Sequence, residues 1–158
     1  MLLWKCLYTF ALSMVPIIEL RGAIPLGFGL GLPLWLNYTL CAVGNFLPVP
    51  FILLFIRRIL DWMKTVHRFK FDKIALWVEA KAQKHSAKVM KGIASGLFLF
   101  VAIPLPGTGA WTGALIAALF DVRMKYALPA IFLGILAAGV IMSLITYGLL
   151  GGIFSIFA

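Results

Sequence analysis

Two apolar stretches of this chain are interrupted midway by prolines and glycines, at 16–25 (PIIELRGAIP) and at 104–113 (PLPGTGAWTG). An ordinary transmembrane helix would continue through such a stretch, because backbone N–H and C=O groups that leave the helix in hydrocarbon lose their partners at a cost of several kcal/mol each. Non-helical backbone persists at membrane depth only where protein or a water-filled cavity surrounds it. The two breaks therefore predict positions that line a site.

The composition indicates which solvent the chain folds in. Hydrophobic residues make up 63% of it and charged residues 12%. A soluble fold of this length cannot bury that much apolar surface, so we predict an all-α integral membrane protein. Residues 2–15 are expected to belong to the mature fold rather than to a signal peptide, because Pro16 and a charged pair follow them instead of a small-residue cleavage site.

Positive charge is concentrated between residues 57 and 91, where ten lysines and arginines and three acidic residues give +7 of the chain's net +9. The positive-inside rule predicts that this segment is cytoplasmic. Its second half is predicted to form an amphipathic helix on an anionic leaflet, with lysines on one side and apolar residues on the other: Lys81, Lys84, Lys88 and Lys91 against Ile74, Trp77 and Val78. No nucleic-acid partner is expected, because no stacking platform or recognised motif accompanies the lysines.

Element lengths predict how the chain crosses the bilayer. A transmembrane helix needs about 20 apolar residues, and 34–56 and 127–149 supply them. Segments 2–32 and 92–120 each contain two shorter apolar arms separated by proline, so each is predicted to be a re-entrant hairpin that enters and leaves on the same side.

These elements divide the chain into a first repeat (1–56), a cytoplasmic segment (57–91) and a second repeat (92–158). With the middle segment inside, the two repeats have opposite orientations, and GAI at 22–24 aligns with GAL at 113–115. This arrangement predicts an inverted-repeat transporter whose broken helices meet at the bilayer midplane. The hairpin tips, near Arg21 and Thr108, are expected to touch there.

Three segments carry a resemblance to a known family: PIIELRGAIPLG at 16–27, GNFLPVP at 44–50 and LFLFVAIPLPGTGAWTGALIAAL at 97–119. They resemble the small multidrug export family, a distant relative of the DedA/VTT membrane proteins. The resemblance implies paired re-entrant hairpins and transport or lipid translocation in the cell membrane of a bacterium or archaeon. DedA proteins are associated with flipping undecaprenyl phosphate, and their eukaryotic relatives with scrambling phospholipids.

Carried over by position, the resemblance implies a set of site residues in the two hairpins. They are Pro16, Glu19, Arg21, Gly22 and Pro25 in the first, and Pro104, Pro106, Gly107, Thr108, Gly109, Trp111 and Gly113 in the second. One departure concerns the second hairpin, where the DedA pattern has arginines beside the proline and this chain has none between 92 and 121.

Glu19 and Arg21 are the charged residues between Lys5 and Arg57. A charge at membrane depth normally faces the bundle interior and has a partner. In one interpretation the two form a structural ion pair that pins the hairpin tip. In the other, Arg21 offers a bidentate donor to an anionic head group, and Glu19 carries a proton whose binding is favoured by burial and opposed by Arg21.

Three other polar side chains are candidates for the same region. Thr108 is expected to cap the half-helix that follows it, and the alternative is that its hydroxyl faces the cavity. Asn37 and Asn45 either line the substrate path or hydrogen-bond another helix.

The two histidines, His67 and His85, have no further ligand at metal spacing, and no Ser-His-Asp or Cys-His set is present. We therefore predict no enzymatic activity, no metal and no cofactor.

Three functions remain. The leading one is translocation of an amphipathic anion, such as undecaprenyl phosphate or a phospholipid, with proton coupling through Glu19. The second is proton-coupled export of small hydrophobic drugs, and the third is a non-transporting membrane assembly factor. Two spans and two hairpins enclose little volume, which is compatible with a homodimer.

Overall fold

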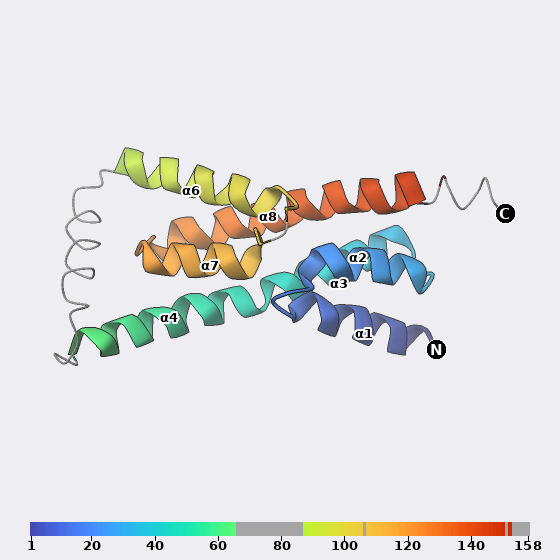
Figure 1. Ribbon diagram of the computed structural model, residues 1–158, viewed down its shortest axis with the longest axis horizontal. Helices are drawn as coiled ribbons and strands as arrows, with labels where there is room; N and C mark the ends of the chain where they lie inside the picture. The colour runs from blue at the N-terminus through green and yellow to red at the C-terminus, as the bar shows by residue number, and fades with distance from the viewer. Residues whose placement is uncertain (66–86, 106, 151, 153–158) are drawn as a thin grey trace.

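The computed structural model describes residues 1–65, 87–105, 107–150 and 152, and the elements in these ranges are all helices (Figure 1). The first half contains α1 (Leu2–Met14), α2 (Glu19–Gly29), α3 (Leu34–Phe46) and α4 (Pro48–Thr65). The second half contains α6 (Ala87–Ala102), α7 (Ala110–Leu119), α8 (Met124–Ser143) and the π-helix η1 (Leu144–Leu150). The all-α class predicted from the sequence is therefore confirmed for the described residues.

Each half begins with a helical hairpin. In the first, the Lys5 ammonium near the start of α1 donates to the carbonyl of Leu30 at the end of α2, 2.6 Å away. Figure 1 shows the α1–α2 hairpin beside the N-terminus, the α6–α7 hairpin at the opposite end of the bundle, and the two tips facing each other near the middle. The α6 arm begins at Ala87, five residues before the expected start at 92.

Two helices are long and apolar enough to cross a membrane, Leu34–Ile59 and Met124–Leu149, with mean hydropathies of 2.1 and 2.5. The first joins α3 to α4 through Leu47, which keeps α-helical angles although Pro48 and Pro50 lack a backbone N–H. The long helices predicted over 34–56 and 127–149 are therefore present, each extended by a few residues.

The outer and inner surfaces have the character expected of a protein in lipid. Large apolar side chains point outward, with Trp35 80% and Phe51 67% exposed. Inside, small residues let helices approach closely: a Cβ on Gly134 would meet the side chain of Val101 at 2.7 Å, and one on Gly139 would meet the ring of Tyr38 at the same distance. Small residues at helix interfaces are how bundles pack in membranes, where apolar burial alone gives no driving force. This is a membrane protein.

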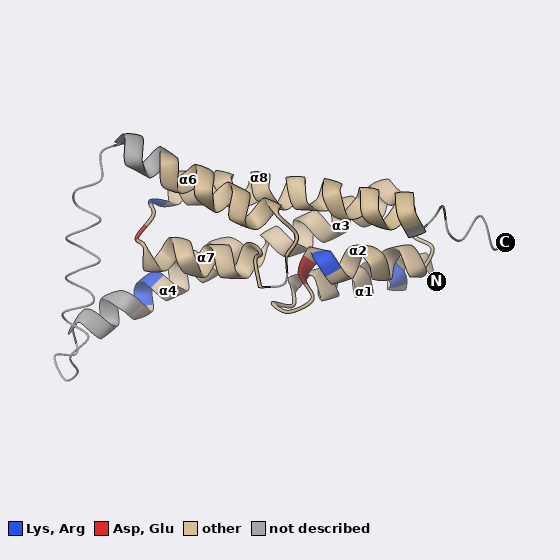
Figure 2. Ribbon diagram, turned by 45° about the horizontal axis from the view of Figure 1, so that its top comes forward, with Lys and Arg blue, Asp and Glu red and all other residues tan. Residues whose placement is uncertain are grey.

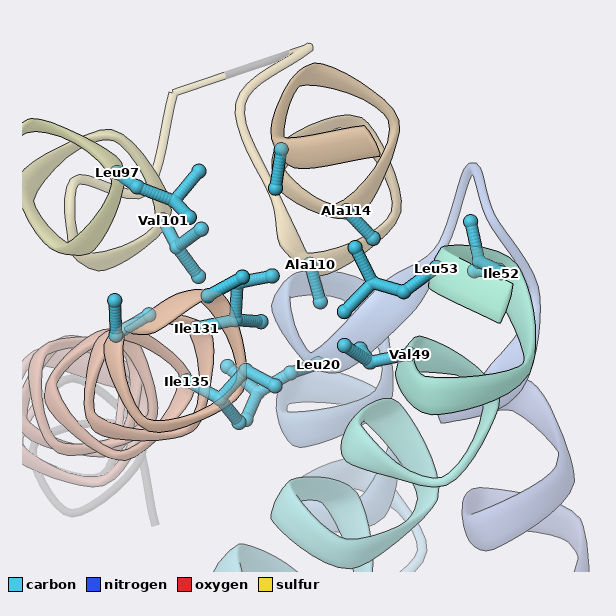
Figure 3. Close-up of a cluster of buried hydrophobic side chains, with 14 of the residues drawn as sticks. Leu20, Val49, Ile52, Leu53, Leu97, Val101, Ala110, Ala114, Ile131 and Ile135 are labelled. Carbon is cyan, nitrogen blue, oxygen red and sulfur yellow. The ribbon is translucent and has the colours of Figure 1, made fainter. Parts of the chain in front are cut away.

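The buried apolar cluster joins the two halves. Figure 3 shows side chains of α2, α4, α6, α7 and α8 converging, and the largest of them are buried almost completely: Leu20, Val49, Leu53, Val101, Ile131 and Ile135. Near the middle of α4, the Arg57 guanidinium donates to the carbonyl of Val122 in the turn between α7 and α8.

The turns that follow the two hairpins have the same backbone design. Leu32 N–H bonds back to the Gly27 carbonyl at 3.0 Å, and Val122 N–H bonds back to the Ala117 carbonyl at 2.8 Å. The residue before each of these donors is left-handed: Gly31 has φ 75° and Asp121 has φ 49°. This is the Schellman motif, which glycine suits best and aspartate tolerates. The two halves thus share this turn as well as the order of their elements.

Part of the predicted cytoplasmic segment lies outside the described residues, including Ile74, Trp77, Val78, Lys81 and Lys84. Its two ends belong to α4, which continues to Thr65, and to α6, which contains Lys88 and Lys91. Pro106 also lies outside the described residues.

Candidate functional site

The hairpin tips form the candidate site, and they hold the acidic and basic residues seen in the middle of the bundle in Figure 2. Val15, which precedes Pro16, is extended, as the proline ring requires, and this ends α1. α2 then begins at Glu19, which has a φ of 47°. A left-handed non-glycine residue costs about 1–3 kcal/mol and is held only where its surroundings determine it. Glu19 is 5% exposed.

The Glu19 carboxylate binds the N-terminus of α7 in the other half of the chain. Its Oε1 accepts a hydrogen bond from the backbone N–H of Trp111 at 3.2 Å. The first N–H groups of a helix have no partner within it and carry the positive end of the helix dipole, so a buried anion is stabilised there. Glu19 therefore caps a helix that begins about ninety residues later, at Ala110.

Gly109 leaves the space that this contact needs. A Cβ at this position would overlap the Glu19 carboxylate, whose carbon lies 2.6 Å from it. The backbone of Gly109 is extended, with φ 179°, so any residue could adopt its conformation. The requirement is therefore one of space between the two tips.

Arg21 holds the other side of the second tip. Its guanidinium donates to the carbonyls of Leu105 (2.6 Å) and Ile103 (3.1 Å) and to the hydroxyl of Thr108 (2.9 Å). The carbonyls of Ile103 and Leu105 lie on either side of Pro104, beyond the end of α6 at Ala102. They therefore accept no hydrogen bond from a following turn of that helix. A planar cation with several donors satisfies such a cluster better than a single ammonium can.

A third contact closes the junction. The indole Nε1 of Trp111 donates to the carbonyl of Met14 at 3.1 Å. Met14 is the last residue of α1, so its carbonyl has no partner inside that helix. Each tip thus supplies the polar groups that the other lacks.

Asn45 approaches the junction from α3. It lines a small cavity of about 10 Å³ together with Glu19, Arg21, Gly109 and apolar side chains of α6 and α8. Its side chain is 3% exposed, and among the described residues its Oδ1 has no hydrogen-bond partner. Asn37, by contrast, hydrogen-bonds the Ile24 carbonyl and the Tyr147 hydroxyl, which is the helix-bonding role that was one of its two alternatives.

One expectation needs correction. Thr108 does not cap α7: the cap position is Gly109, and the Thr108 hydroxyl lies 2.7 Å from the Ile103 carbonyl and inside the turn. The distant Glu19 takes the capping role, because its carboxylate reaches the N–H groups that Thr108 would serve. Of the two interpretations of Glu19 and Arg21, the direct ion pair is not seen within the described ranges, because the hydrogen bonds of both side chains go to the second hairpin.

The remaining site residues shape the tips. Pro16 lies in the first turn, Pro25 lies inside α2, and Pro104 and Gly107 lie in the second turn, where Gly107 has a φ of 85°. A Cβ on Gly22 would meet the side chain of Ile18 at 2.6 Å. Sequence reasoning missed the carbonyls of Met14, Ile103 and Leu105. Only the last two had a signal, their place beside Pro104.

Exchanging Gly109 for alanine should destabilise the junction. The new methyl group would overlap the Glu19 carboxylate, and we expect a loss of about 1–3 kcal/mol in the free energy of unfolding, as for other overpacked sites. The measurement is thermal or denaturant unfolding in detergent. Gly96→Ala is the matched control, because Gly96 lies in α6 with nothing within 4 Å of an added Cβ. An equally stable Gly109→Ala protein would contradict the described packing.

Comparison with known proteins identifies the family. A family model described as "Putative small multi-drug export protein" matches residues 19–141, a range that runs from Glu19 through both hairpin tips and into α8. No curated protein and no solved structure matches the chain. The match covers more than half of the sequence and confirms the resemblance noted from the proline-glycine segments. The chain belongs to the small multidrug export protein family.

Proposed function

We propose that the protein is a secondary transporter that moves amphipathic anions, such as a polyprenyl phosphate or an acidic phospholipid, across the cell membrane. The observation that carries the proposal is the Glu19 carboxylate at the N-terminus of α7, beside Arg21. A buried helix N-terminus with a cation beside it is a ready anion site. In the described conformation the protein's own carboxylate occupies it.

The proposal includes the membrane arrangement. The hairpins α1–α2 and α6–α7 are re-entrant, the two halves form an inverted repeat, and the tips meet near the bilayer midplane. Three features support this: the repeated order of elements, the matching turns at Gly31 and Asp121, and the contact between tips from opposite ends of the bundle (Figure 1). Broken helices at the midplane are where inverted-repeat transporters bind their substrates.

Proton coupling follows from competition for the same N–H groups. While Glu19 is ionised, it holds the N-terminus of α7 and keeps the tips together. Once protonated, it loses its attraction to the helix dipole, and the anionic head group of a substrate can take its place. A proton then accompanies each anion, so a pH gradient drives net movement.

Export of small hydrophobic drugs is the second candidate, because the description of the family favours it. An exporter of cations needs a carboxylate free to pair with its substrate, whereas Glu19 is bonded to α7 and lies beside Arg21. Those contacts favour an anionic substrate.

Transport in proteoliposomes tests the proposal. Vesicles would carry a fluorescent anionic phospholipid, its zwitterionic counterpart or a lipophilic cation, each with and without a pH gradient. We expect the gradient to accelerate movement of the anionic lipid alone. Gradient-driven movement of the cation alone would establish the exporter instead, and movement of none of the three would leave a non-transporting role.

Orientation is tested separately. We predict that residues 57–91 face the cytoplasm and the N-terminus faces outward, because the basic segment carries most of the net charge. In a background without Cys6 and Cys41, an impermeant maleimide added to intact cells should label Gly29→Cys and leave Ala80→Cys unlabelled. The reverse labelling would invert the topology.

A further inference from the structure

Asn45 has an unmet hydrogen-bonding requirement. Its side chain is 3% exposed, and among the described residues its buried Oδ1 has no hydrogen-bond partner. Asn37 lies on the same helix, is 0% exposed, and donates to the Ile24 carbonyl at 2.8 Å and the Tyr147 hydroxyl at 3.0 Å. Leaving a buried polar group unpaired costs about 1–3 kcal/mol, and native proteins rarely do so. Asn45 therefore points to a partner outside the described residues.

The space for such a partner lies beside Glu19. The cavity at the junction measures about 10 Å³ and has Glu19, Arg21 and Asn45 among its lining residues. That is close to the volume that one water molecule requires, and the polar side chains around it are a carboxylate, a guanidinium and an amide. The rest of the lining is largely apolar, so the polar side of the cavity determines where the molecule binds.

We propose that one water molecule binds in this cavity and connects the carboxyl group of Glu19 to the amide of Asn45. A metal cation is a poorer occupant, because Arg21 and the N-terminus of α7 place positive charge beside it. Water can donate to one group and accept from the other, as a carboxyl–amide bridge requires. The bridge makes Asn45 a positioning residue for the water rather than a group that contacts substrate.

The consequence of this bridge rests on the proposed function. When Glu19 is protonated, its O–H can donate to the water, and the water can donate to Asn45 Oδ1. The protonated carboxyl group is then hydrogen-bonded after it leaves the N-terminus of α7. Asn45 thereby stabilises the state of the junction in which the anion site is free.

Water-edited solid-state NMR on the protein in lipid vesicles tests the site without any transport. Magnetisation should pass from water to the side-chain amide of Asn45 but not to that of Asn37, a buried asparagine with protein partners. Ala138→Val adds bulk to the cavity lining and should abolish the Asn45 signal, whereas Ala130→Val, on the same helix outside the lining, should leave it. Equal signals from the two asparagines would overturn the proposal. So would an Asn45 signal that changes when sodium is replaced by choline, which would indicate a cation.

A transport measurement then tests the positioning role. Asn45→Leu removes the amide at similar size, and we expect it to slow pH-driven movement by about tenfold, the factor that corresponds to one lost hydrogen bond. Asn45→Ser keeps a polar group and should retain more of the rate. Unchanged coupling in Asn45→Leu would overturn the positioning role while leaving the proposed function intact. Absence of transport in the unaltered protein would refute the function and leave the NMR result unaffected.

Discussion

Replacing Glu19 with glutamine is expected to make transport independent of a pH gradient while downhill movement of the anion partly survives. Glutamine has the same shape, and its amide oxygen can still accept the Trp111 N–H, so the contact between the tips is kept. The variant carries no ionisable proton and no charge to compete with an anion. Because bonds to a neutral acceptor are about half as strong as charge-assisted ones, we also expect about 1 kcal/mol lower stability.

The measurement compares initial rates in proteoliposomes with and without a pH gradient. Asp121→Asn is the matched control: Asp121 is also a carboxylate on left-handed backbone, but it lies in the exposed turn between α7 and α8. It should respond to the gradient like the unaltered protein. A Glu19→Gln protein with full gradient dependence would remove Glu19 from the coupling mechanism.

Changes at Arg21 are expected to have the largest effect on both stability and transport. Arg21→Gln removes the donors that serve two carbonyls and one hydroxyl of the second tip, and hydrogen bonds from a charged group are worth about 1.5–3 kcal/mol each. Arg21→Lys keeps the charge without the planar fork and should be intermediate. Translocation should fall in the order arginine, lysine, glutamine.

The stability of the double variant distinguishes two explanations. If Glu19 and Arg21 formed a structural ion pair with each other, neutralising both would restore the stability that each single variant loses. Because their hydrogen bonds go to different groups of the second hairpin, we expect the double variant to remain at least as unstable as Arg21→Gln. Lys5→Gln is the control, since Lys5 also bonds a carbonyl but lies at the other end of its hairpin. Restored stability together with full activity in the double variant would make the two residues a structural clip.

The sequence predicted the positions of the tips better than their partners. Pro16 and Pro104 lie close to where the structure ends α1 and α6, because the effect of proline on its neighbours is local, whereas Pro25 lies inside α2 and did not end it. The charges of Glu19 and Arg21 in an apolar stretch identified the buried polar site for a similar reason. Their partners are backbone groups, which every residue carries, and only the position of Ile103 and Leu105 beside Pro104 gave a signal for two of them.

Thr108 and Gly109 also show that contacts between distant segments cannot be predicted from the local sequence. A threonine just before a helix predicts a local cap, and only the packing of the two halves shows that a carboxylate from α2 has taken that position. The space at Gly109 is likewise a property of the assembled tips. For Asn45, the sequence did not decide between lining the substrate path and hydrogen-bonding another helix. The lack of a hydrogen-bond partner for its Oδ1 among the described residues is visible only in the structure.

The exchange of partners between the tips also affects how the protein is made. Synthesis proceeds from the N-terminus, so Glu19 and Arg21 enter the membrane before Ile103, Leu105 and Trp111 have left the ribosome. During that interval both charges lack the groups that neutralise their cost in hydrocarbon. In the proposed membrane arrangement, we therefore expect the first hairpin to reach its final position only after the second hairpin has entered the membrane. Biogenesis of the two halves is in this way coupled through a few hydrogen bonds at the centre of the molecule.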